Sequence, residues 1–166
     1  MGVSALNLTP DPDEWRSRLA DDDATIADIL GRMRRIAVIG IKPAEAGGPA
    51  STVPAYLQRH GFTIIPVPVY YPDITEILSE PVHRSLATVD PPADLVQLFR
   101  RPEDVPKHLD ELLAARPRVV WMQLGIRHDG VAETLARAGI HVIQDRCLQV
   151  ELGRHAHSVK TSPGAD

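Results

Sequence analysis

Between residues 36 and 143 the chain alternates short apolar runs with longer segments in which apolar residues recur every three or four positions. The apolar runs carry almost no charge, which is typical of strands covered on both faces. The segments between them have the periodicity of helices. Five strands alternating with helices predict an α/β fold, a doubly wound (Rossmann-like), mostly parallel five-stranded sheet flanked by helices. The predicted strands are residues 36–40, 62–67, 94–99, 119–124 and 140–143.

Capping residues predict where the helices between these strands begin and end. We expect Ser51 to cap the first helix and Gly61 to end it. Pro102 is expected to open the next helix, and Gly139 to close the one after it. Residues 77–86 are rich in turn-forming residues, so we expect only a helical turn and a short extended piece there.

The chain divides into three parts by its pattern. Residues 1–30 read as an N-terminal helical extension, in which a short helix from Pro10 carries Trp15 and Leu19 and the acids at 21–23 start a second helix. Residues 31–152 form the Rossmann-like domain. Residues 153–166 are polar and are expected to be a loose tail.

Composition narrows the function classes. The formal net charge is -4, which disfavours non-specific nucleic-acid binding. The apolar runs fall far short of the roughly 20 residues that a membrane span needs. The N-terminus has no basic segment followed by an apolar one, and Cys147 is the single cysteine, so we expect a cytoplasmic protein. Its partners are then small molecules or other proteins, a second copy of the chain included.

Parallel strands carry their ligands beyond their carboxyl ends, so the segments that follow the strands are the candidates for a site. They are residues 40–51, 66–70, 99–101, 123–127 and 145–147.

The first of these segments is a candidate phosphate loop. Gly40 ends a strand, Gly47 and Gly48 allow close approach of backbone to a ligand, and Ser51 opens a helix whose N-terminus suits a pyrophosphate. The spacing is not that of the common dinucleotide fingerprint, so a flexible loop without a ligand is the alternative.

The second segment separates the possible cofactors. NAD-binding domains place an acid at the end of the second strand to hold the ribose, and this chain has no acid there before Asp73. NAD is therefore disfavoured. The arginines at 100, 101, 127 and 146 would suit the phosphates of coenzyme A, although each could equally be a surface ion pair.

The chain resembles the small bacterial CoA-binding proteins, a family related to the nucleotide domain of the succinyl-CoA synthetase α-subunit. The resemblance spans residues 29–151, and its most specific parts are Trp-Met-Gln-Leu-Gly at 121–125 and Asp-Arg-Cys at 145–147. The other matching stretches are residues 36–40, Ser51, Val53, Tyr56–Leu57, 65–67 and 96–100.

The resemblance implies a domain that binds coenzyme A or an acyl-CoA, with one role for each segment. The loop at 40–51 would hold the pyrophosphate, and residues 66–67 would flank the adenosine. Residues 99–100 would close over the ligand, and residues 123–125 would line the pantetheine path. The residues expected to bind the ligand are Gly40, Ile41, Lys42, Gly47, Gly48, Ser51, Thr52, Pro66, Val67, Pro68, Phe99, Arg100, Arg101, Gln123, Leu124, Gly125 and Cys147.

Two positions depart from the family pattern. Lys42 stands where the family has a small hydroxyl residue, and it either meets a phosphate or points to solvent. Pro68 stands where the family has Asn, which removes a polar contact.

No catalytic residue and no metal site are expected. The seven histidines are scattered, and His155 and His157 lie two apart in the expected tail with no cluster of carboxylates or cysteines around them. We therefore expect a carrier, sensor or accessory module without its own catalysis. The alternatives are a redox-active or NAD-using enzyme centred on Cys147, and a domain that has lost its ligand and serves protein contacts.

Overall fold

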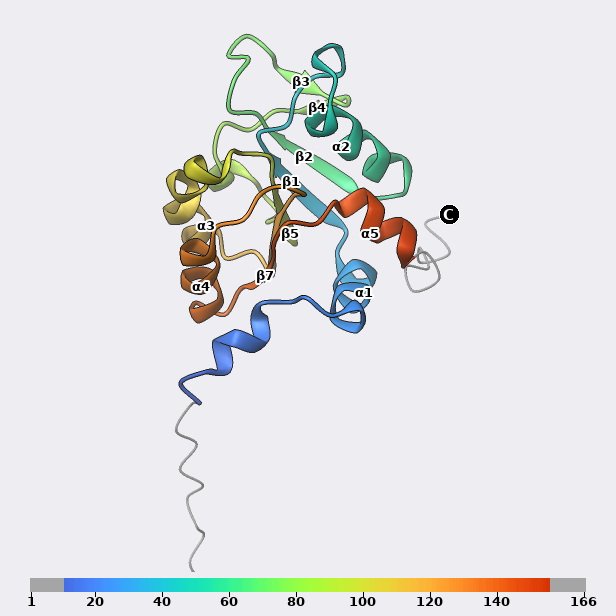
Figure 1. Ribbon diagram of the computed structural model, residues 1–166. Helices are drawn as coiled ribbons and strands as arrows, with labels where there is room; N and C mark the ends of the chain where they lie inside the picture. Colours follow the sequence, from blue (N-terminus) through green and yellow to red (C-terminus); the bar gives the residue numbers. More distant parts are fainter. Residues whose placement is uncertain (1–10, 156–166) are drawn as a thin grey trace, which may run out of the picture.

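All five predicted strands form, and they pair side by side in one sheet. The computed structural model describes residues 11–155 (Figure 1). Every pairing in the sheet is parallel, and the strands lie in the order β2-β1-β5-β6-β7. This confirms the α/β, doubly wound fold. The strands are β1 (Arg35–Ile39), β2 (Thr63–Val67), β5 (Leu95–Leu98), β6 (Val119–Met122) and β7 (His141–Ile143).

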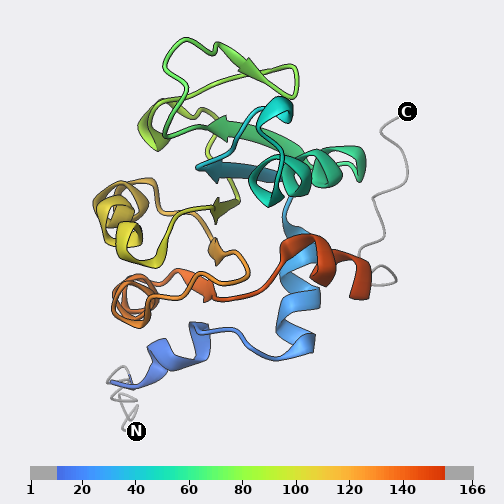
Figure 2. The same cartoon turned by 45° about the horizontal axis from the view of Figure 1, so that its top comes forward.

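Helices cover both faces of the sheet (Figures 1 and 2). One face packs against α1 (Asp23–Arg32), α2 (Pro49–Arg59) and α5 (Leu148–Arg154), which bury Leu30, Leu57 and Leu148 on it. The other face packs against α3 (Leu109–Ala115) and α4 (Asp129–Arg137), which bury Leu112 and Leu135. Successive residues of a strand point to opposite faces, so each strand needs apolar residues at every position, which explains its uninterrupted apolar run.

Short elements connect the strands and helices. The segment after β2 forms the hairpin of β3 (Glu76–Ile77) and β4 (Glu80–Pro81), followed by the single turn η3 (Leu86–Thr88). Further 3₁₀ turns are η1 (Glu14–Arg18), η2 (Ala44–Ala46) and η4 (Pro102–His108).

Two predicted helices differ in detail from the structure. Ser51 is not the cap of α2, because Gly48 takes that position and Pro49 is the first helical residue, which leaves Ser51 buried in the first turn. The helix expected from Pro102 is broken into η4 and α3. Pro106 lies inside the 3₁₀ part, and its missing N–H and fixed ring oppose an α-helix there.

Both ends of the described chain pack against the domain. Leu19 forms a parallel bridge with Val142 of β7, and the N–H of Ala20 donates to the Val142 carbonyl at 3.0 Å. At the other end α5, which the sequence analysis does not predict, runs through Arg154, one residue beyond the expected start of the loose tail. Its Leu148 and Leu152 are four positions apart and both enter the core, which fixes the helix. Pro10, His157 and the rest of the tail lie outside the described residues.

Within residues 11–155, no helix combines the length and the apolar character that crossing a membrane would need.

Gly40 is the glycine with the closest neighbouring backbone. It follows β1 with φ of +85°, and a Cβ built on it would lie 2.2 Å from the carbonyl oxygen of Phe99. Phe99 follows β5, so the loops after two neighbouring strands touch backbone to backbone at this position. Only glycine satisfies both the dihedral angle and the contact.

We expect Gly40→Ala to lower the free energy of unfolding by about 3 kcal/mol, because positive φ and the displaced Phe99 carbonyl both cost energy. Gly139→Ala is the matched control: its φ is +92°, but a Cβ there meets nothing within 4 Å. The control should lose only about 1 kcal/mol. Equal losses in denaturant unfolding would mean that the contact with Phe99 contributes nothing.

Candidate functional site

The strand order places the candidate site at the carboxyl ends of β1 and β5. From β1 the chain crosses to β2 on one side, and it then returns to β5 on the other side. In open parallel sheets ligands bind at such a reversal, and we call the region beside the two loops that leave β1 and β5 the crevice. Hydrogen bonds hold the two loops and the end of β2 together: the N–H of Gly40 donates to the Val67 carbonyl at 2.9 Å, and the N–H of Phe99 donates to the Ile39 carbonyl at 2.9 Å.

The loop between β1 and α2, the candidate phosphate loop, turns sharply at its two glycines. Gly47 and Gly48 have φ of +65° and +76°, so the backbone turns in the left-handed region just before the helix. The N–H of Lys42 donates to the Ala50 carbonyl at 3.1 Å, which ties the start of the loop to the first turn of α2. The side chains of Lys42 and Thr52 are exposed, whereas Ile41 is buried in the core. The result is a helix N-terminus beside the crevice.

The side chain of Arg100 passes over Gly40 and is fixed by contacts with neighbouring side chains. Its Cδ lies 3.4 Å from the Cβ position of Gly40, and its guanidinium lies 5.9 Å from the centre of the Tyr70 ring. Its Nε contacts Nε2 of His108 at 3.1 Å, and its terminal nitrogen is 3.8 Å from Asp104. Arg100 therefore joins the ends of β2 and β5, with its charge already partnered.

Asp104 is the centre of this charge network. It accepts hydrogen bonds from Lys107 at 2.7 Å and from Arg101 at 3.2 Å, and it is itself 5% exposed. The hydrogen bond from Lys107 lowers the pKa of the Asp104 carboxyl below its usual range, and that from Arg101 adds to the effect. Arg101 and Lys107 are the exposed members of the group, with their side chains at the surface.

A buried pair of amides lies under the site. Gln123 is 4% exposed, and its Oε1 accepts from Nε2 of Gln97 at 3.0 Å and from the N–H of Leu148 at 3.2 Å. Gln123 thus holds the first residue of α5 and is not a wall of an open path. Sequence reasoning missed Gln97. A glutamine in the middle of an apolar strand was the available signal, because a buried amide needs a partner.

Leu124 and Cys147 line a cavity of about 330 Å³ beyond the ends of β6 and β7. Leu124 is 66% exposed and Cys147 is half-buried. The N–H of Gly125 donates to Oδ1 of Asp145 at 2.7 Å, so this glycine shapes the turn.

The guanidinium of Arg146 bonds to carboxylates and not to the thiol of Cys147, its neighbour in the sequence. It contacts Asp21 at 2.6 Å and Glu151 at 3.3 Å. The hydrogen bond to Asp21 raises the pKa of Arg146. The structure therefore adds no support for a redox or NAD-using enzyme centred on Cys147.

The end of β2 is buried at the residues expected to flank an adenosine. Pro66, Val67 and Pro68 are all inaccessible, whereas the next two residues, Val69 and Tyr70, are 37% and 59% exposed. Among the described residues, the large apolar side chains with such exposure are Val69, Tyr70, Leu124 and Val150. All four follow the carboxyl ends of strands. Apart from Leu124, they were not among the predicted binding residues.

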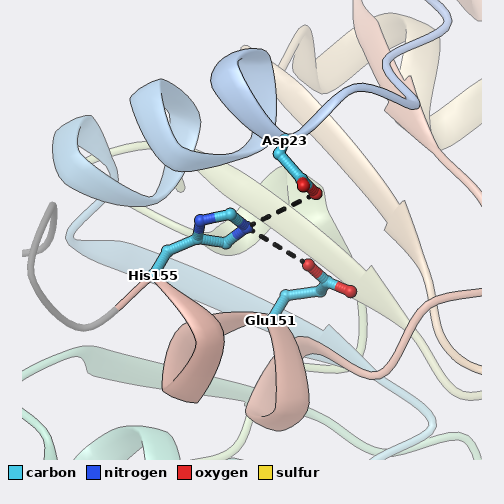
Figure 3. A group of neighbouring side chains, drawn as sticks. All are labelled: Asp23, Glu151 and His155. Carbon is cyan, nitrogen blue, oxygen red and sulfur yellow. Dashed lines mark ion pairs between the residues drawn. The ribbon is translucent and has the colours of Figure 1, made fainter.

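The fold also brings together three titratable side chains far apart in the sequence (Figure 3). Nε2 of His155 lies 3.4 Å from Glu151 and 4.0 Å from Asp23. This corrects the sequence analysis, which found no cluster of carboxylates around His155. Arg146 and Arg154 both contact the buried Glu151, at 3.3 and 3.1 Å. Two guanidinium groups on the central carboxylate oppose a metal ion, so the cluster is an ion-pair network that joins α1 to α5.

The model of the CoA binding domain family matches residues 34–153. The chain belongs to this family. The match begins just before β1 and ends within α5, so it contains the whole sheet and every element of the crevice. It leaves out η1 and α1.

A curated relative and several solved structures resemble the chain over most of its length. The uncharacterized protein YneT of Bacillus subtilis is 35% identical over 136 residues, which are 82% of this chain and 94% of YneT. A Thermus thermophilus protein described as cell-free ID.343 is 37% identical, with a TM-score of 0.74 over 81% of this chain and 99% of that one. A hypothetical protein from Pyrococcus horikoshii is 26% identical, with a TM-score of 0.75 over 82% of this chain and 94% of its own.

We expect Asp104→Asn to lower the melting temperature at pH 7, because Arg100, Arg101 and Lys107 then lose their shared carboxylate. The folded-state pKa of Asp104 is depressed, so its stabilisation is present above the unfolded-state pKa and disappears as the pH falls through the folded-state value. Thermal melts at pH 7 and at pH 3 measure this. The gap between variant and wild type should shrink in acid, and a gap of constant size would contradict the assignment.

Proposed function

We propose that this protein binds coenzyme A or an acyl-CoA in the crevice between β1 and β5, with the pyrophosphate at the loop 40–48 and the N-terminus of α2. The observation that carries the proposal is the backbone contact between Gly40 and Phe99 at the point where the strand order reverses. It places a glycine-rich loop and a helix of 11 residues beside the crevice. Such a helix start presents N–H groups and partial positive charge to an anion.

The distribution of exposed side chains along the same edge fits a ligand of this kind. Val69 and Tyr70 stand at the β2 end, and Leu124 and Val150 stand at the β6 and β7 end. The phosphate loop lies between these two apolar ends. Coenzyme A has the matching order: a flat adenine, a charged pyrophosphate, and a long pantetheine arm of low charge.

Lys42 supports phosphate binding at this loop. Its side chain is exposed next to the loop, and within the described residues it makes no ion pair. By contrast Arg100 and Arg146 are already partnered by carboxylates. Lys42, which departs from the family pattern, is thus the cation that we propose to meet a phosphate.

We further propose that the protein acts as a carrier, sensor or accessory module. The polar side chains nearest the crevice hold the fold together: Arg100 bonds His108, and Gln123 bonds Gln97 and the start of α5. Because these side chains already hydrogen-bond within the protein, they are not free to act on a ligand. This favours ligand binding over catalysis.

Thr52→Glu tests the position of the phosphates. Thr52 is exposed in the first turn of α2, where a carboxylate favours the helix but repels a bound pyrophosphate. We expect the variant to keep its melting temperature and to bind CoA about tenfold or more weakly in calorimetric titrations. NAD should give no heat of binding with the wild type, since β2 ends without an acid.

Thr63→Glu is the matched control. It makes the same change of charge at the exposed start of β2, at the amino ends of the strands and away from the proposed site. It should bind CoA as the wild type does. An equal loss in both variants would point to the net charge of the protein and remove the phosphate loop from the proposal. A wild-type protein that binds no CoA at millimolar concentration would refute CoA binding itself.

A further inference from the structure

Two neighbouring cavities form a trough that runs from Leu124 and Cys147 to the N-terminal extension. The cavity at Leu124 and Cys147 adjoins a second one of about 400 Å³, and the two share Asp21, Arg127 and Gln144 as lining residues. The first cavity holds about 330 Å³. An octanoyl group has nine non-hydrogen atoms, which at about 30 Å³ each need roughly 270 Å³, less than either cavity.

The outer wall of this trough comes from the segment between η1 and α1. Trp15, Leu19, Ala20 and Asp21 line the second cavity opposite α4 and β7. The bridge between Leu19 and Val142 fixes this wall against the edge of the sheet. The segment lies outside the part of the chain that the CoA binding domain model matches, so the wall is not part of the matched family domain.

The lining of the trough selects a class of occupant. Its apolar lining comes from Leu19 on the outer wall and from Ala132 and Val142 on the opposite side. Its charged residues are five acids and two arginines, so negative charge is in excess. The acids are Asp21, Asp129, Glu133, Asp145 and Glu151, and the arginines are Arg127 and Arg146. The excess of acids disfavours an anionic occupant, and the apolar residues suit an aliphatic one.

The trough lies along the carboxyl ends of the strands from the proposed phosphate site. Leu124 follows β6, which lies two strands from β1, about 10 Å along the edge of the sheet. A pantetheine arm that starts at the phosphate loop and follows this edge brings its sulfur to the cavity of Leu124 and Cys147.

We propose that this trough receives the aliphatic acyl group of an acyl-CoA, and that the protein prefers such thioesters to free CoA. This inference rests on the proposed function and adds the class of its ligand. A carboxylate-bearing acyl group, such as succinyl, meets the acids of the lining and gains nothing over CoA.

The test compares CoA, octanoyl-CoA and succinyl-CoA by calorimetric titration of the full chain. We expect octanoyl-CoA to bind about tenfold or more tightly than CoA, since several methylene groups leave water. Succinyl-CoA should bind no more tightly than CoA. Equal affinities for CoA and octanoyl-CoA would overturn the acyl site and leave CoA binding intact, whereas failure of all three ligands would refute both proposals.

Variants locate the acyl group. Leu19→Glu puts a carboxylate into the wall, and Trp15→Ala removes part of the wall without adding charge. Both should lose the preference for octanoyl-CoA and keep the affinity for CoA. Val89→Glu is the control for Leu19→Glu, because it is equally half-buried and lines a separate cavity of about 290 Å³ near the start of β5. If both wall variants keep the preference, the acyl group lies elsewhere and the proposal is wrong.

Discussion

The fold depends on one contact, that of the Phe99 carbonyl with Gly40. Neighbouring parallel strands end side by side, and here the loops that leave them are pressed together until no side chain fits between them. Because Gly40 has no Cβ, the stem of Arg100 can pass over it and reach the end of β2 at Tyr70. The pairing of the two loops and the contact of Arg100 with Tyr70 both depend on this close approach.

The pattern of apolar residues was sufficient to predict the sheet, because each strand is buried on both faces and so appears as an uninterrupted run. The ends of the helices were harder to predict. Ser51 has the right chemistry for a cap, but the Gly48-Pro49 pair before it starts the helix earlier. Helix α5 was missed because its stability comes from Leu148 and Leu152 entering a core whose shape a single sequence does not reveal.

The predicted binding residues fall into two groups, those chosen for their backbone and those chosen for their side chains. Those predicted from the backbone, such as Gly40 and Gly48, do adopt the positive φ angles that were the reason for choosing glycines. Those predicted from side-chain charge or polarity were less dependable: Arg100, Arg146 and Gln123 all bond to partners that are distant in the sequence. Spacing along the chain cannot show which partners the fold supplies. The same limit hid the grouping of Asp23, Glu151 and His155, which come from opposite ends of the domain.

The bridge between Leu19 and Val142 has a consequence for solubility. β7 is an edge strand, and an uncovered edge offers its N–H and C=O groups to any other extended chain. The segment around Leu19 occupies part of that edge, with the N–H of Ala20 bonded to the carbonyl of Val142. The N-terminal extension thus protects the sheet against pairing with a second molecule, and a form of the protein that lost it would be prone to aggregate through β7.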